Sequence, residues 1–216
     1  MSDFSSVFIV DDHPMMRMGL TCLINAADGL QVVGEAGSAR EALTKLEEIE
    51  SPDLILLDIS LPDKNGLELL KDLKTVSQES KSLVMSSHDE DVYAERVLKA
   101  GGRGYVTKDR APEQLVDAVR RVLKGEIFLS GAMTAKMMEV FAGGESTGSS
   151  VSSLTDRELE VYRLIGEGCA SREIAAKLGV SIRTVDAHRT HIKDKLGLRD
   201  AADLSYQAIR WMESQS

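Results

Sequence analysis

The sequence has few cysteines, no long apolar run and no overall excess of basic residues, and each shortage excludes a class of protein. Its two cysteines, Cys22 and Cys169, lie far apart in apolar segments, so we expect reduced packing thiols and neither a disulfide framework nor a zinc site. No run approaches the roughly 18 apolar residues of a membrane span, and the acidic start of the chain lacks the basic region of a secretory signal. We therefore expect a cytoplasmic protein with no membrane contact.

The shortage of basic residues is uneven along the chain. Overall, 26 lysines and arginines face 35 aspartates and glutamates. Residues 1–124 carry 15 basic and 22 acidic residues, whereas residues 154–216 carry ten of each. Within residues 181–199 there are five basic and two acidic residues, a local charge of +3. An acidic first part is therefore joined to a second part that holds a basic segment, so the overall charge does not exclude nucleic-acid binding by the second part.

The first part alternates short aliphatic runs with longer amphipathic segments, and 216 residues suffice for two domains. The expected strands cover residues 7–10, 30–36, 54–58, 82–87 and 103–107. The first expected helix begins at His13 and Pro14. The other four cover residues 39–48, 66–74, 89–100 and 112–124. This alternation predicts an α/β fold, a flavodoxin-like, doubly wound, five-stranded parallel sheet with helices on both faces.

Beyond residue 125 the pattern is wholly helical. The expected helices cover residues 130–141, 154–168, 171–179, 182–196 and 201–212, and residues 142–153 are rich in glycine and serine, which indicates a flexible tether. A short helix, a glycine turn and a longer basic helix form a helix-turn-helix arrangement. We therefore divide the chain into a domain over residues 1–125, a linker over residues 126–153 with one helix and the tether, and an all-α, four-helix domain over residues 154–216.

Polar residues follow four of the predicted strands. Asp11 and Asp12 follow the first strand, Asp58 follows the third, Ser86 ends the fourth and Lys108 follows the fifth. Because the carboxyl ends of parallel strands meet at one edge of a sheet, these side chains should converge. Three carboxylates repel one another unless a hard cation such as Mg²⁺ neutralises them. With an ammonium and a hydroxyl beside them, the acids predict a phosphoryl site that can form an aspartyl-phosphate.

These motifs resemble those of the two-component response regulators. "DDHP" at residues 11–14, "LLDISLPDKNG" at residues 56–66, Ser86 and "GYVTKD" at residues 104–109 are similar to the receiver-domain pattern. The resemblance implies that Asp58 is the phosphoacceptor and that the Ser60 backbone carbonyl joins Asp11, Asp12 and Asp58 as a Mg²⁺ ligand. It also implies that Ser86 and Lys108 contact the phosphoryl group. Tyr105 would be the aromatic whose rotamer follows activation, although a half-buried strand aromatic explains it equally well.

"LTDRELEVYRLIGEG" at residues 154–168 and "EIAAKLGVSIRTVDAHRTHIKDKLG" at residues 173–197 resemble the LuxR-type helix-turn-helix, which makes the whole sequence similar to the NarL/FixJ family. The resemblance implies a transcription regulator rather than an enzyme, phosphorylated by a sensor histidine kinase. When phosphorylated it would form a homodimer and bind two-fold symmetric DNA sites, with RNA polymerase as a further partner.

The expected DNA-reading helix has two faces. Spacings of three and four place Val185, His188, Ile192 and Leu196 on a face that packs inward. The family resemblance puts base contacts at Asp186, Ala187 and Thr190, and phosphate contacts at Thr184 and the basic neighbours Arg183, Arg189, Lys193 and Lys195. An acid at Asp186 repels phosphates. We expect it to pair with Arg183 or Arg189, the alternative being that it accepts from a cytosine amino group.

Three other functions were weighed for the acidic site, and a feature of the sequence disfavours each. A haloacid-dehalogenase-like phosphatase needs a second aspartate two residues after the nucleophile, where this chain has Ser60. A flavodoxin-like cofactor binder would bring the phosphate of FMN against three carboxylates. A regulator that ignores phosphorylation would be expected to lose part of the acid set. Two mechanisms of control also remain open: the acidic domain masks the basic helix before phosphorylation, or phosphorylation acts by dimerisation alone.

Overall fold

The computed structural model describes residues 4–109, 112–141 and 150–214. The chain divides into two compact units, Met1–Ala142 and Gly143–Ser216, and each is described by itself. Among the helices in the described ranges, none is long and apolar enough to cross a membrane.

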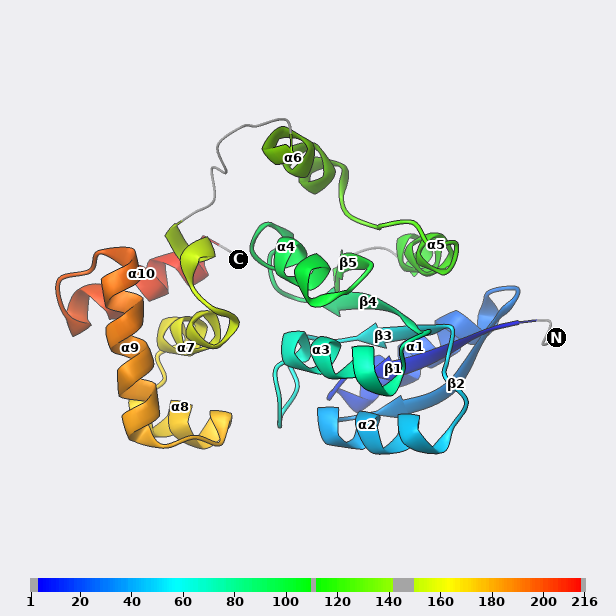
Figure 1. Cartoon of the computed structure of the whole chain (residues 1–216), viewed down its shortest axis with the longest axis horizontal. Coiled ribbons are helices and arrows are strands. Elements are labelled where there is room, and N and C mark those ends of the chain that lie inside the picture. The colour runs from blue at the N-terminus through cyan, green and yellow to red at the C-terminus, as the bar shows by residue number, and fades with distance from the viewer. Residues whose placement is uncertain (1–3, 110–111, 142–149, 215–216) are drawn as a thin grey trace. The chain divides into compact units, whose positions relative to one another are not determined.

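The first unit is built on a five-stranded sheet whose strands follow the five aliphatic runs (Figure 1). The strands are β1 (Ser5–Val10), β2 (Leu30–Ala36), β3 (Leu54–Leu57), β4 (Lys81–Ser86) and β5 (Gly104–Thr107). All neighbouring strands pair in parallel, in the order β2-β1-β3-β4-β5. The predicted flavodoxin-like, doubly wound sheet is therefore confirmed. The strand order reverses between β1 and β3, which are the strands that lead into Asp11 and Asp58.

Five helices cover the two faces of the sheet, as the alternating pattern predicts. They are α1 (Pro14–Ala26), α2 (Ala39–Glu48), α3 (Gly66–Val76), α4 (Glu90–Ala100) and α5 (Pro112–Leu123). On one face α1 contacts α5, while α2 contacts α3 and α3 contacts α4 on the other (Figure 1). Alternate strand residues such as Val7 and Ile9 pack with Leu115 and Val119 of α5 in one core cluster. The sheet is thus buried on both sides, which explains the unbroken aliphatic runs of β1 and β3.

A short segment after α5 extends the edge of the sheet beside β5. Phe128 donates its backbone N–H to the carbonyl of Arg103 at 3.0 Å, and the Tyr105 N–H donates to the Phe128 carbonyl at 2.9 Å. The approach is close enough that a Cβ on Gly104 would lie 2.7 Å from the Phe128 carbonyl oxygen. Glycine is therefore required at residue 104 by the neighbouring backbone.

Helix α6 (Gly131–Phe141) follows this segment and is held to α4 at two points. The Ser130 N–H donates to Glu90 Oε1 at 2.7 Å, and Lys136 Nζ lies 3.4 Å from Asp91 Oδ1. The helix predicted over residues 130–141 is thus present and is joined to α4 by polar contacts, while its Met138 is 66% exposed.

The second unit is wholly helical. It contains a short 3₁₀ helix (Ser150–Ser153), α7 (Asp156–Gly166), α8 (Ser171–Leu178), α9 (Ile182–Leu196) and α10 (Ala201–Glu213). The predicted capping box is present at the start of α7, where Thr155 and Glu158 bond to each other's backbone N–H groups. Gly179 makes the turn between α8 and α9 with φ of 63°.

The Gly/Ser-rich segment predicted as a tether, residues 142–153, is described only in part. Residues 142–149 are outside the described residues. Residues Ser150–Ser153 form the 3₁₀ helix, in which Val151 is only 5% exposed.

Candidate functional site

The acidic residues predicted to converge do so at the carboxyl edge of the sheet. Backbone hydrogen bonds continue the ladder just past the strands, from the Asp58 N–H to the Val10 carbonyl at 2.8 Å and from the Lys108 N–H to the Ser86 carbonyl at 2.9 Å. These bonds align the residues that follow four strands. Segments separated by up to 97 residues in sequence therefore present their side chains to one another.

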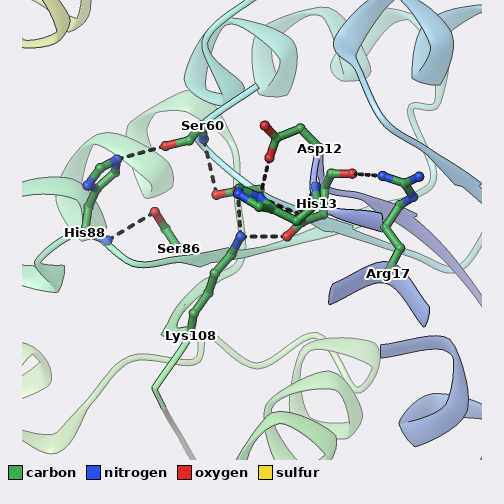
Figure 2. Close-up of polar contacts among 9 residues, drawn as sticks. Asp12, His13, Arg17, Ser60, Ser86, His88 and Lys108 are labelled. Atoms are coloured by element: carbon green, nitrogen blue, oxygen red, sulfur yellow. Dashed lines mark hydrogen bonds and ion pairs between the residues drawn. The ribbon is translucent and has the colours of Figure 1, made fainter. Parts of the chain in front are cut away.

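Lys108 bridges two buried carboxylates (Figure 2). Its Nζ donates to Asp11 Oδ2 at 2.6 Å and to Asp58 Oδ2 at 2.7 Å, and these aspartates are only 1% and 3% exposed. Burial raises the pKa of Asp58, although the Lys108 hydrogen bond opposes this rise. Burial alone would lower the pKa of Lys108, but its bonds to Asp11 and Asp58 outweigh burial and raise that pKa. The ammonium thus supplies the positive charge that two buried carboxylates need.

The site also includes two residues that the sequence analysis did not assign, His13 and Arg17. His13 donates its backbone N–H to Asp11 Oδ1 at 2.8 Å, and Arg17 Nη1 donates to the Asp11 carbonyl at 2.6 Å (Figure 2). Both residues therefore fix the loop that carries Asp11 and Asp12. The available signal was their position at the start of α1 beside two acids; His13 was interpreted only as part of a helix start, and Arg17 was not singled out.

The carboxylates fit a hard divalent cation. One ligand atom from each of Asp11, Asp12, His13 and Asp58 lies within 4.8 Å of all the others. Asp12 Oδ1 is buried and accepts no hydrogen bond within the described part of the chain. A buried carboxylate oxygen without a donor is costly, and a cation is the alternative partner. Oxygen donors of this kind suit Mg²⁺.

Ser60, Ser86 and His88 lie next to one another, away from Asp12 and Arg17 (Figure 2). The Ser60 N–H donates to Asp58 Oδ1 at 3.2 Å, and its Oγ lies 3.0 Å from His88 Nε2. Ser86 Oγ accepts from the His88 N–H at 3.3 Å. The loops after β3 and β4 are thus joined by a side-chain contact next to the candidate phosphoacceptor.

Tyr105 is fully enclosed rather than half-buried, at 1% exposure. Its hydroxyl donates to the His88 carbonyl at 2.7 Å, and burial raises the pKa of this phenol. The side chain therefore contacts the loop that carries Ser86 and His88.

Gly66 allows α3 to begin close to Asp58. Its N–H donates to the Ile59 carbonyl at 2.8 Å, and a Cβ at residue 66 would lie 2.4 Å from the Asp58 carbonyl oxygen. Any larger residue must therefore displace either the helix or the loop that carries the site. The same loop is fixed to α2 by Asp63, whose carboxylate accepts from the N–H groups of Ala39 and Arg40.

In the second unit, α9 has the two faces that the sequence predicts. Val185 and Ile192 are fully buried, and His188 and Leu196 are partly buried. The residues assigned to DNA remain accessible to differing degrees: Arg183, Thr184, Asp186, Ala187, Thr190 and Lys195 are exposed, and Arg189 and Lys193 are half-buried. One side of this helix thus stays open beside the packed side.

Two polar residues of α9 have partners other than those expected. Asp186 Oδ1 accepts from the Ser171 hydroxyl at 3.1 Å, so its side chain turns to the start of α8 and not to Arg183 or Arg189. The short Ser171 side chain reaches Asp186 because α8 and α9 pack against each other in the helix-turn-helix. Lys195 Nζ donates to Glu158 Oε2 at 2.6 Å, which gives this lysine a structural partner inside the domain.

Comparison with known proteins gives matches in both units. A model of the response regulator receiver domain matches residues 7–120, and a model of bacterial regulatory proteins of the luxR family matches residues 152–208. The oxygen regulatory protein NreC of Staphylococcus aureus (strain MRSA252) is 35% identical over 210 residues, which span 94% of this chain and 96% of the relative.

Among solved structures, RcsB of Salmonella enterica serovar Typhimurium, bound to promoter rprA with the phosphomimetic BeF₃⁻, is similar with a TM-score of 0.69 and 25% identity. The match covers 94% of this chain and 97% of the RcsB chain. A structure of two RcsB dimers on two parallel DNAs gives a TM-score of 0.59 and 26% identity, over 94% of this chain and 97% of that chain.

Proposed function

This chain belongs to the two-component response regulators that join a receiver domain to a LuxR-type DNA-binding domain, and on that premise we propose that phosphorylation of Asp58 controls DNA binding through α9. Both matched families are regulatory, so the chain is a phosphorylation-controlled transcription regulator. The observation that carries the assignment of Asp58 is its position beside Lys108 and Asp11 at the carboxyl edge of the sheet. We assign the receiver to residues 1–125, the linker to residues 126–153 and the DNA-binding domain to residues 154–216.

The phosphoryl group is transferred from a phosphohistidine of a sensor histidine kinase. A carboxylate oxygen of Asp58 attacks phosphorus, the P–N bond to the imidazole breaks with its electron pair passing to the nitrogen, and an acyl phosphate forms. Lys108 stabilises the negative charge that the phosphoryl oxygens carry in the transition state. Its ammonium, 2.7 Å from Asp58 Oδ2, needs little movement for this role.

Mg²⁺ is the cofactor that the donor set suits, and the carboxylates of Asp11, Asp12 and Asp58 with the Ser60 carbonyl would hold it. When bound, it neutralises phosphoryl and carboxylate charge at the same place. The buried Asp12 oxygen without a hydrogen-bond donor supports this assignment.

Ser86 and Tyr105 transmit the effect of Asp58 phosphorylation to the rest of the receiver. Ser86 Oγ accepts a long bond from the His88 N–H, and its O–H would donate to a phosphoryl oxygen. A shift of residues 86–88 would change the partner of the Tyr105 hydroxyl, which is the His88 carbonyl. Because the Tyr105 N–H bonds to the Phe128 carbonyl, the shift would reach the segment that leads into α6. Phosphorylation thereby changes the relative populations of two receiver conformations.

We infer that the phosphorylated chain binds two-fold symmetric DNA as a homodimer and acts on RNA polymerase. The RcsB dimers on DNA support the dimer. A two-fold protein reads two half-sites, and the exposed side of α9 supplies the residues for the major groove.

Phosphotransfer is tested by labelling the full chain from acetyl phosphate in the presence and absence of Mg²⁺. Wild type should be labelled only with Mg²⁺, and Asp58→Ala should not be labelled. Asp28→Asn is the matched control, because Asp28 is an exposed acid before β2, at the opposite end of the strands. Equal labelling of wild type and Asp58→Ala would remove Asp58 from this role.

A further inference from the structure

His13 places an imidazole at the acidic cluster that the proposed function leaves unused. It precedes α1, and its side chain caps no backbone N–H of that helix. Instead, its Nδ1 lies 2.6 Å from Asp12 Oδ1 and 3.4 Å from Asp11 Oδ1 (Figure 2). Although the side chain is 69% exposed, it is therefore turned to the acids rather than to the helix.

The contact between His13 Nδ1 and Asp12 Oδ1 is an ion pair when the imidazole is protonated. Asp12 Oδ1 is otherwise a buried oxygen with no hydrogen-bond donor within the described residues. In a neutral imidazole the lone pair of Nδ1 can bind a metal ion, so this nitrogen and the Asp12 oxygen can serve the same ion.

We propose that the His13 imidazole is itself a ligand of the divalent cation, an inference that rests on the metal site of the proposed function. Its Nδ1 belongs to the set of four ligand atoms, with one from each of Asp11, Asp12 and Asp58, that lie within 4.8 Å of one another. Carboxylate and carbonyl oxygens suit Mg²⁺, whereas an imidazole nitrogen favours later transition metals such as Co²⁺. His13 therefore gives this receiver a mixed donor set that binds Co²⁺ relatively better than oxygen ligands alone would.

The proposal is tested on the unphosphorylated full chain with Co²⁺ and Mg²⁺ as the probes. Isothermal titration calorimetry of His13→Ala should show a Co²⁺ affinity about tenfold lower than wild type, with Mg²⁺ affinity changed by less than about threefold. The proton NMR spectrum of the Co²⁺ form should show a shifted, exchangeable imidazole N–H signal that His13→Ala lacks. This signal reports a bound imidazole directly.

Two other histidines supply the controls. His88 is the second imidazole beside the site, 3.0 Å from Ser60 Oγ, and His191 is an exposed imidazole 3.9 Å from Glu158 in the other unit. His191→Ala should keep both the shifted signal and the Co²⁺ affinity, and His88→Ala should keep the shifted signal.

Three results would overturn the proposal: equal losses of Co²⁺ and Mg²⁺ affinity in His13→Ala, no loss of either, or a shifted signal that survives in His13→Ala and disappears in His88→Ala. If wild type bound neither ion, the Mg²⁺ site of the proposed function would fail together with the role of His13. If wild type and His13→Ala bound both ions alike, only the role of His13 would fail. Asp58 labelling is measured separately and is unaffected by either result.

Discussion

The phosphoryl site and the exposed side of α9 are built in opposite ways. Asp11 and Lys108 are 97 residues apart in sequence and meet at 2.6 Å, buried among charges that compensate one another. Arg183 and Thr184, by contrast, lie within two residues on the open side of one helix. The first site depends on the whole fold, so one substitution disturbs every member. The second is a set of separate contacts, so its substitutions should act independently.

The largest effect expected on the buried site comes from Lys108→Ala. Without the ammonium, Asp11 and Asp58 become buried carboxylates with no compensating cation, and the receiver should lose about 3 to 5 kcal/mol of its free energy of unfolding. Urea unfolding followed by far-ultraviolet circular dichroism measures this loss, and added Mg²⁺ should restore part of it. Lys64→Ala is the control, because the Lys64–Asp72 pair is about one-third exposed and its loss should cost little. Similar losses in both variants would contradict the account.

Glu158 is the buried charge of the second unit and extends the comparison to it. Its carboxylate, 4% exposed, accepts from Lys195 and from the Thr155 N–H, so Glu158→Ala should destabilise this unit by about 2 to 3 kcal/mol. Fluorescence of Trp211, the only tryptophan, reports this unit alone during unfolding of the full chain. If Glu158→Ala lowered the stability only in unfolding transitions that Trp211 fluorescence does not detect, Glu158 would not stabilise the second unit.

The same residue gives a pH dependence with a defined sign. Burial would raise the pKa of Glu158, but the bonds from Lys195 and Thr155 outweigh it and lower that pKa below its usual 4.5. The stabilisation is therefore present above pH 4.5 and is lost as the pH falls through the folded-state pKa. Wild type and Glu158→Gln should accordingly converge in stability as the pH falls from 4.5 through the lower folded-state pKa. Parallel stability curves across that range would exclude this contribution.

On the exposed side of α9, single substitutions should have smaller and separable effects. Thr190→Ala should change base preference by roughly 1 to 3 kcal/mol at one base pair if the side chain touches a base edge. Lys193→Ala should weaken binding to all sequences and reduce the salt dependence. Binding to a panel of single-base variants at two salt concentrations separates the two. Uniform weakening by both substitutions would show that the reading face is wrongly assigned.

The smallest effect expected is on the lifetime of the phosphoryl group. The contact between Ser60 Oγ and His88 Nε2 lies beside Asp58 and borders the path of a hydrolytic water. His88→Ala should therefore alter the rate of dephosphorylation without preventing phosphorylation. Decay of labelled protein after removal of acetyl phosphate measures the rate. An unchanged decay would leave His88 with a purely structural role.

The elements and the convergence of the acids were predictable because they follow from periodicity. Unbroken aliphatic runs separated by amphipathic segments predict a parallel sheet, and in such a sheet the residues after β1 and β3 must meet. The capping box at Thr155 was visible for the same reason, since it is defined by spacing along one helix.

Contacts set by the final packing were not predictable in this way. Asp186 was expected to pair with an arginine on its own helix, but the structure turns it to Ser171 of the preceding helix. The last four residues of the predicted tether form a 3₁₀ helix with Val151 buried. His13 was predicted only as part of a helix start, and Arg17 was not singled out at all. Their contacts with Asp11 and Asp12 depend on side-chain directions that spacing does not specify.

The central claim is that phosphorylation of the buried Asp58 changes what the exposed α9 binds. It is tested most directly by selecting genomic DNA fragments with the full chain in Mg²⁺, with and without acetyl phosphate, for wild type, Asp58→Ala and Asp28→Asn. The account predicts that wild type and Asp28→Asn enrich the same set of fragments only when acetyl phosphate is present, and that Asp58→Ala enriches none of them. The same fragments recovered equally by wild type and Asp58→Ala, with or without acetyl phosphate, would contradict it.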